Sequence, residues 1–266
     1  MIDDDAKADY ARDGVCVLRG AFAPAWIETV AEGVRQALDA PGPHGERYGP
    51  AGAERFFGDL DMWTRLDPFR DFVMNSPAAE IAGRTMGSST ATFLYDQMLV
   101  KEPGSQQRTP WHQDQPYWAV SGFQVCSIWM PLDPVPSEVS LEFVRGSHRW
   151  DQTFNPTHFA DGTPYAGTGL PSLPDIEADR SAYDIVSWDL EPGDCVVFQA
   201  MLVHGAPANP SAGRRRVLST RWLGDDARYE KHAGEIAIPT DSSGLVEGEA
   251  YGGPRHPCVW RDKAAR

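Results

Sequence analysis

The sequence predicts one β-sandwich or barrel domain with helices packed on its outside. Helical patterns are confined to the first third of the chain, and short turn-bounded strands follow from Thr90 onward. Helices followed by a series of strands are typical of such an architecture. With 266 residues, 41% of them apolar and 11% aromatic, the chain can build one large core. We therefore expect residues 1–266 to form a single domain.

The N-terminal part begins with a strand and continues with helices. A β-branched run at residues 15–18 follows an Asp-Gly turn and predicts a short strand. Pro24 predicts the start of a helix, because its missing N–H is harmless in the first turn. Residues 42–58 are rich in Gly, Pro and charge and predict a loop. Residues 70–86 are helical in pattern, with a start or break at Pro77.

The remaining chain reads as strands separated by turns and one long insert. The strand segments are residues 91–100, 124–132, 140–144, 195–199 and 217–223. The insert at about 151–188 is rich in Pro, Gly, Asp and Thr. Since a loop of this length in a compact domain is usually functional, we expect a lid or substrate-binding segment. Residues 244–266 are expected to be irregular.

Charge and cysteine usage narrow the class of protein. A formal net charge of −14 argues against binding to nucleic acid or an anionic membrane, since both need a basic surface. There is no apolar run long enough to span a membrane and no secretory signal pattern at the start. The four cysteines lie far apart without a C-x-x-C pair, which favours free thiols in a reducing compartment. We expect a cytoplasmic protein.

The segment at residues 109–116 carries the first candidate site, an H-x-D pair formed by His112 and Asp114. On an extended segment, residues i and i+2 point to the same face. His204, at the end of an apolar run, offers a third ligand. Two histidines and one carboxylate form the facial triad of non-haem Fe(II) oxygenases. The alternatives are a chance H-x-D pair and a histidine with satisfied hydrogen bonds in the core.

Three consecutive arginines follow, and they divide between the two faces of any strand. Arg215 would take one face and Arg214 and Arg216 the other. An arginine beside a metal site suits a bidentate clamp on a carboxylate. The alternative is a solvated basic run, and strand alternation alone does not choose among the three.

An ordered set of motifs resembles the phytanoyl-CoA dioxygenase family of Fe(II)/2-oxoglutarate-dependent oxygenases. The matching segments are residues 13–20, 96–104, 109–114, 128–133, 146–149 and 204–216. The resemblance implies a mostly β fold with flanking α-helices, built on a double-stranded β-helix of the jelly-roll, cupin-like kind. It also implies Fe(II), 2-oxoglutarate and O2 as cofactor and cosubstrates. The implied reaction is hydroxylation of an unactivated C–H bond, with release of succinate and CO2; desaturation and ring formation are the alternative oxidations.

The resemblance assigns roles to individual residues. It implies His112, Asp114 and His204 as iron ligands, and the family spacing selects Arg215 for 2-oxoglutarate. Helper contacts to 2-oxoglutarate are implied at Gln97, Thr109 and Trp129.

The substrate is expected to be a small molecule. Trp118, Phe123 and Arg221 are candidates for lining its pocket, together with the 151–188 insert. Arg221 shares strand parity with Arg215, whereas Lys101 is expected to be solvated. A basic cluster suited to the phosphates of CoA is missing from the sequence. Two other functions use the same residues: a Zn(II) hydrolase with the same three ligands, and a non-catalytic jelly-roll binding module.

Overall fold

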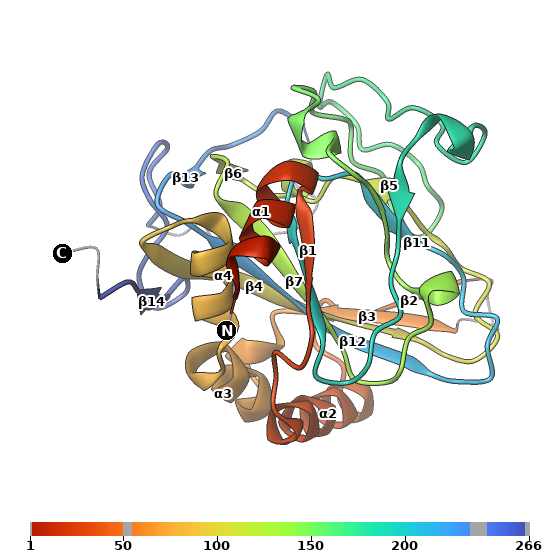
Figure 1. Cartoon of the computed structure of the whole chain (residues 1–266), viewed down its shortest axis with the longest axis horizontal. Helices are drawn as coiled ribbons and strands as arrows, with labels where there is room; N and C mark the ends of the chain where they lie inside the picture. Colours follow the sequence, from red (N-terminus) through yellow and green to blue (C-terminus); the bar gives the residue numbers. More distant parts are fainter. Residues whose placement is uncertain (1, 50–54, 235–243, 264–266) are drawn as a thin grey trace.

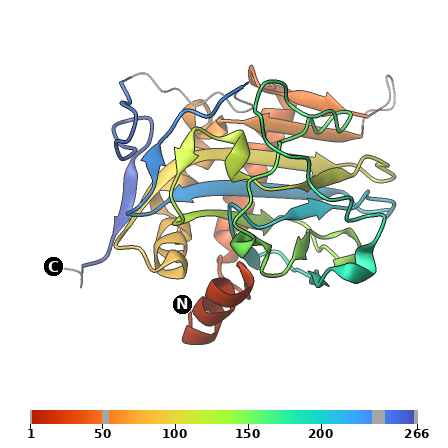
Figure 2. The ribbon, with the colours of Figure 1, turned by 90° about the horizontal axis from the view of Figure 1, so that it is seen from above.

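The computed structural model describes residues 2–49, 55–234 and 244–263, and its strands form antiparallel sheets. The large sheet has eight strands, and in Figure 2 its long strands β4 and β12 run side by side across the molecule. In spatial order it contains β1 (Val15–Leu18), β10 (Cys195–Gln199), β7 (Val125–Pro131), β12 (Arg215–Leu223), β4 (Thr90–Lys101), β3 (Phe56–Leu60) and β2 (Glu46–Tyr48), with β14 (Cys258–Arg261) also paired to β4.

A smaller sheet lies against one face of the large one. It contains β5 (Thr109–His112), β11 (His204–Ala206), β8 (Glu142–Val144) and β9 (Ile185–Val186). A separate two-stranded antiparallel sheet is formed by β6 (Val120–Ser121) and β13 (Arg228–Tyr229). The described residues also contain five short 3-10 helices: η1 (Met62–Thr64), η2 (Gln115–Tyr117), η3 (Ser137–Val139), η4 (Ser147–Arg149) and η5 (Arg180–Ala182).

The α-helices of the described chain, four in number, cover the other face of the large sheet (Figure 1). They are α1 (Asp4–Asp13), α2 (Pro24–Asp39), α3 (Asp67–Asn75) and α4 (Ala78–Met86). As predicted, α2 begins at its proline, and the helical pattern at residues 70–86 is broken at Pro77 into α3 and α4. The sequence reading missed α1, which begins after Asp3 because this carboxylate accepts the N–H of Ala6 at 2.8 Å.

The large sheet separates two apolar layers, because side chains alternate between the two faces of a strand. Along β7, Ile128 and Met130 pack with the helices, whereas Trp129 packs with residues of the small sheet. Along β12, Leu218 faces the helices and Val217 faces the small sheet. The predicted jelly roll with flanking helices is confirmed, and the odd-numbered residues of β12 up to Arg221 point into the space between the sheets.

Two predictions about irregular segments were wrong. Residues 42–58 contain β2 and the start of β3, since Phe56 and Phe57 are buried and pair with β4; residues 50–54 lie outside the described residues. Residues 244–266 contain β14, which extends the same sheet beside the start of β4. In both segments the strand is stabilised by a distant partner, so local composition alone gives no sign of it.

Two further expectations were tested by the structure. The cysteines are free thiols, with Cys16, Cys126 and Cys195 buried. Over the described part of the chain, none of the helices has the length and apolarity needed to cross a membrane.

Candidate metal centre

Two histidines face each other across the small sheet. His112 is the last residue of β5, His204 is the first residue of β11, and the two are cross-strand partners. The expectation that His204 ends the preceding apolar strand was wrong. That strand, β10, ends at Gln199, and residues 200–203 turn the chain from the large sheet into the small one. This turn delivers His204 beside His112.

Asp114 reaches the same place from a turn. Its backbone is helical (φ −74°, ψ −44°), so the extended segment ends before it and strand parity does not orient it. The backbone N–H groups of Asp114 and Gln115 donate to the carbonyl of Ala200 at 2.8 and 3.0 Å. The same turn that positions His204 therefore also holds Asp114.

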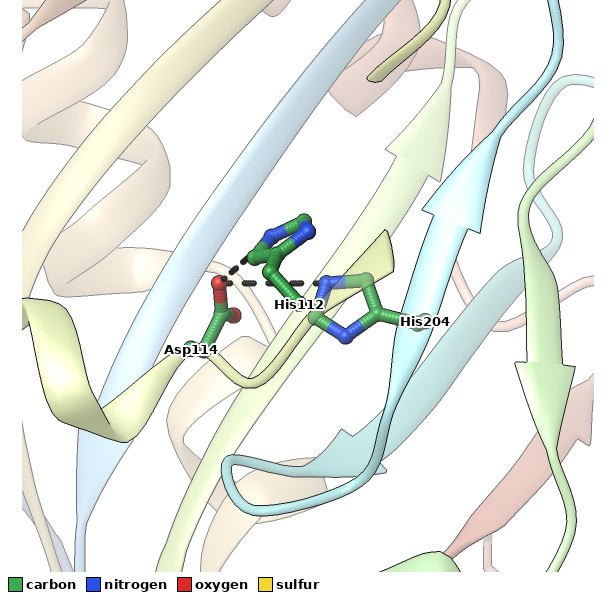
Figure 3. A group of neighbouring side chains, drawn as sticks. All are labelled: His112, Asp114 and His204. Carbon is green, nitrogen blue, oxygen red and sulfur yellow. Dashed lines mark ion pairs between the residues drawn. The ribbon is translucent and has the colours of Figure 1, made fainter. Parts of the chain in front are cut away.

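The three side chains present their ligand atoms to one point (Figure 3). Oδ1 of Asp114 lies 3.5 Å from Nε2 of His112 and 3.8 Å from Nε2 of His204. The Nδ1 atoms lie 2.8 and 2.9 Å from the carbonyls of Pro110 and Leu202. Since a carbonyl only accepts, each Nδ1 carries a proton, and Nε2 is the ring atom that is available to a metal.

The protonation states also suit a cation. Burial and the neighbouring His112 lower the pKa of His204 to about 3, so its ring is neutral at pH 7. Burial alone would raise the pKa of Asp114, but His204 and then Arg221 outweigh it, and the pKa is lowered below its ordinary value. A buried carboxylate beside two imidazoles, of which that of His204 is neutral, fits a divalent transition metal such as Fe(II) or Zn(II).

The second oxygen of Asp114 is fixed by two residues of the large sheet. Ser127 Oγ donates to Oδ2 at 2.7 Å, and Arg221 Nε lies 4.0 Å from the same oxygen. These residues are cross-strand partners on β7 and β12. Oδ1 is therefore left to face the histidines. Sequence reasoning missed Ser127, and only its inward parity on β7, shared with Trp129, hinted at this role.

We expect Ser127→Ala to weaken Mn(II) binding about tenfold, because residues that orient a ligand typically contribute that much to metal affinity. The measurement is a titration of metal-free protein with Mn(II). Ser219→Ala is the matched control, since Ser219 is equally buried and its hydroxyl has no partner among the described residues. Equal affinities for the two variants would contradict a role for Ser127.

Arg215 alone of the three arginines points inward. Arg214 pairs with Glu102 at 2.8 Å and Arg216 with Asp133 at 2.6 Å, both near the surface. Arg215 is 5% exposed, donates through Nη1 to the carbonyl of Val139, and has no ion pair within the described chain. Burial lowers the pKa of Arg215 to about 10. A buried guanidinium without a carboxylate partner suits an anionic ligand.

The three other candidates for cosubstrate contacts are buried. Trp129 lies under Arg215, with the guanidinium 6.0 Å from its ring centroid. Gln97 accepts a hydrogen bond from Arg221 through Oε1 at 2.7 Å. Thr109 begins β5 opposite Ala206. None of these contacts involves a ligand, so the roles of the three residues stay predictions.

A cavity opens beside Asp114. It is lined by His44, Glu46, Tyr48, Gly58, Asp59, Leu60, Tyr95, Gln97, Asp114, Tyr117, Trp118, residues 157–160, Tyr165 and Arg221. The 151–188 insert thus supplies one wall, and Trp118 and Arg221 lie where a substrate contact was expected. The contribution of residues 44–48 to the cavity wall was not predicted, because the composition of that segment indicated a loop.

Two expectations about single residues were wrong. Phe123 is 54% exposed in the β6–β7 turn and does not line this cavity, because the turn carries it away from the sheets. Lys101 is fully buried rather than solvated, because its place on β4 points between the sheets. Its Nζ donates to the carbonyl of Pro207 at 3.0 Å.

Comparison with known proteins agrees with the fold. The epimerase SnoN from nogalamycin biosynthesis, a non-haem α-ketoglutarate-dependent enzyme, has 21% identity and a TM-score of 0.77, covering 97% of this chain and 98% of its own. EctD from S. alaskensis, solved with 2-oxoglutarate and 5-hydroxyectoine, has 18% identity and a TM-score of 0.71, covering 94% of this chain and 86% of its own.

Sequence comparison identifies the family. A probable phytanoyl-CoA dioxygenase of Caenorhabditis elegans is 25% identical over 139 residues, which is 50% of this chain and 43% of the relative. The match therefore spans less than half of that relative. The family model for phytanoyl-CoA dioxygenase (PhyH) matches residues 10–217, well over half of the chain. This chain is a member of the phytanoyl-CoA dioxygenase family.

Proposed function

We propose that the protein is an Fe(II)- and 2-oxoglutarate-dependent oxygenase that hydroxylates an unactivated C–H bond of a small molecule. The observation that carries the proposal is the pairing of a buried His-Asp-His triad with a buried arginine that lacks a carboxylate. A dicarboxylate cosubstrate uses both, one end at the metal and the other at the arginine. Family membership and the fold shared with α-ketoglutarate-dependent enzymes support this reading.

Each residue has a definite task in this proposal. His112, Asp114 and His204 would hold Fe(II) through two Nε2 atoms and Oδ1. Arg215 would bind the distal carboxylate of 2-oxoglutarate. Iron, 2-oxoglutarate and O2 together supply the oxidising power, and succinate and CO2 are released. The protein contributes orientation and a cavity whose aromatic walls, among them Tyr117 and Phe159, exclude water near His112.

The competing functions account for fewer of these features. A Zn(II) hydrolase would use the triad but would leave Arg215 buried without a task. A non-catalytic binding module does not need an intact triad. SnoN is an epimerase, so the outcome of the oxidation differs among proteins of this fold. We propose hydroxylation, and a substrate bound in the cavity beside Asp114.

The test is turnover of 2-oxoglutarate. Protein would be loaded anaerobically with Fe(II) and 2-oxoglutarate, then exposed to O2 with a panel of ring-bearing and linear metabolites. Succinate and a product heavier by one oxygen atom are expected in the wild type and lost in His112→Ala. Succinate formation that survives in that variant would rule out the iron assignment.

We expect Arg215→Ala to weaken 2-oxoglutarate binding by roughly 10- to 100-fold, because a charge-assisted bidentate contact is lost. Calorimetry with the Mn(II)-loaded protein measures the affinity. Arg214→Ala and Arg216→Ala are the matched controls, since they remove the same charge from surface ion pairs. A larger loss in either control would show that the wrong arginine has been chosen.

A further inference from the structure

One wall of the cavity beside the triad comes from the hairpin of β2 and β3. Glu46 and Tyr48 are two residues apart on β2 and therefore point to the same face of the sheet. Their cross-strand partners on β3 are Gly58 and Phe56. The ammonium of Lys101 lies 4.9 Å from the ring centroid of Phe56, between the sheets. Glu46 and Tyr48 therefore face the same space, and both line the cavity.

Tyr48 is held in this wall by its neighbours. A Cβ on Gly58 would lie 3.3 Å from the Tyr48 ring, so the glycine lets the ring rest against β3. The ring centroids of Tyr48 and Phe56 are 4.8 Å apart. Burial, then the charge and hydrogen bond of Glu46, and then Tyr165 raise the pKa of the Tyr48 hydroxyl above its ordinary value. The wall thus presents a carboxylate and an aromatic ring side by side.

A second wall is aromatic and belongs to the long insert. The Tyr117 hydroxyl accepts the N–H of Thr157 at 2.8 Å and donates to its carbonyl at 2.7 Å, which ties the insert to the turn beside the metal ligands. The rings of Phe159 and Tyr165 lie 5.8 and 5.9 Å from the Tyr117 ring, centroid to centroid. A ring bound in the cavity would therefore have aromatic partners on both walls.

The positive charge of the lining is already engaged. Arg221 is the single Lys or Arg side chain among the described lining residues. It donates to Oε1 of Gln97 at 2.7 Å and to the carbonyl of Ser219 at 2.9 Å. Its Nε lies 4.0 Å from Oδ2 of Asp114. An anionic substrate would have to compete with these acceptors for the guanidinium.

Glu46 is the carboxylate of the lining that has no balancing charge. Asp59 forms an ion pair with Arg65, and Asp114 lies beside Arg221. Glu46 is exposed and forms no ion pair with a described residue. Its charge adds to a net charge of −14, which attracts cations. Since Asp114 is only 5% exposed, Glu46 lies at the outer end of the cavity and the metal ligands at the inner end.

We propose that the cavity takes a ring-bearing substrate with a protonated amine. The ring packs against Tyr48 and Tyr165, and the ammonium lies beside the Glu46 carboxylate, where aromatic faces add cation–π attraction. This assignment rests on the proposed function and names the chemical class of its substrate. The site disfavours a substrate carried on an anionic phosphate group, because Glu46 would repel it.

The charge preference is tested with three probes that share one ring system. Protein loaded with Mn(II) and 2-oxoglutarate would be titrated by calorimetry with 2-naphthylmethylamine, the alcohol 2-naphthylmethanol and the anion 2-naphthoate. We expect the amine to bind roughly 5- to 10-fold more tightly than the alcohol, because an ion pair and a cation–π contact each add a small increment. The anion should bind most weakly. Broadening of the amine's proton resonances by Mn(II) would place the probe beside the triad.

Variants assign the preference to named side chains. Glu46→Gln should reduce the advantage of the amine over the alcohol by roughly threefold or more and leave the affinity for the alcohol unchanged. Tyr48→Leu should weaken amine and alcohol alike, because a ring contact is lost. The control is Glu28→Gln, which removes the same charge from an exposed position of α2 on the other side of the large sheet. Because Glu46 is exposed, its variant should unfold at the wild-type temperature.

Failure of this assignment and failure of the proposed function give different results. Alcohol or anion binding as tight as that of the amine, or an advantage of the amine that survives in Glu46→Gln, would overturn the substrate class. If the same protein binds Mn(II) and 2-oxoglutarate, the proposed function stands. A wild type that binds neither Mn(II) nor 2-oxoglutarate would overturn both.

Discussion

Asp114→Asn should bind Fe(II) or Mn(II) more than roughly 100-fold less tightly than the wild type and should lose oxidation. A neutral amide is a poor ligand, and removing a direct ligand should cost more than the roughly 10- to 100-fold lost with a residue that only orients one. The substitution preserves size and leaves an oxygen for the Ser127 hydroxyl, so the local structure is retained. Metal titration followed by calorimetry measures the effect.

The matched control is Asp133→Asn, which removes the same charge from a partly exposed ion pair with Arg216. It should bind metal as the wild type does. Metal affinity in Asp114→Asn within threefold of the wild type would mean that the histidines bind the ion without this carboxylate. The buried pairing of Asp114 with Arg221 would then be its main role.

The fold was largely predictable from local patterns. The β-branched runs that became β1, β4, β7, β10 and β12 are long or apolar enough to be recognised without their partners. The short strand β2 is not, because its stability comes from pairing with β3. The same reason hides β14, which a distant strand holds in place.

The candidate site was predicted as a set of residues but not as a geometry. Strand parity suggested that His112 and Asp114 share a face, yet Asp114 is oriented by a turn bound to Ala200. Ser127 was missed and Lys101 was wrongly expected to be solvated, because their inward placement follows from the register of neighbouring strands. Register depends on long-range pairing, which a single sequence does not display.

Asp96, a buried acid on the helix side of β4, gives the second large effect. Its pKa is shifted upward, whereas the pKa of Asp114 is shifted downward. Burial, and then the neighbouring Asp61, raise the pKa of Asp96 to about 7. Its carboxylate accepts the backbone N–H of Trp63 at 3.1 Å, and Arg255 offsets the burial only in part because it pairs with Asp61. Above pH 7 the folded protein must therefore hold a poorly compensated buried charge.

We expect Asp96→Asn to stabilise the protein at pH 8 by up to an amount on the order of 4 kcal/mol, and by little near pH 4. Between the unfolded pKa of about 4 and the folded value near 7, the folded state holds the extra proton, so wild-type stability falls as pH rises through this interval. The amide keeps an acceptor for Trp63 and adds a donor near Asp61, whose Oδ1 has no partner among the described residues.

Denaturant unfolding at pH 4, 6 and 8 measures the difference in stability between Asp96→Asn and the wild type. The control is Asp67→Asn, because the side chain of Asp67 is 94% exposed. A gain that is equal at all three pH values would trace the effect to packing, and a loss of stability at pH 8 would show that the ionised carboxylate is well compensated in the folded state.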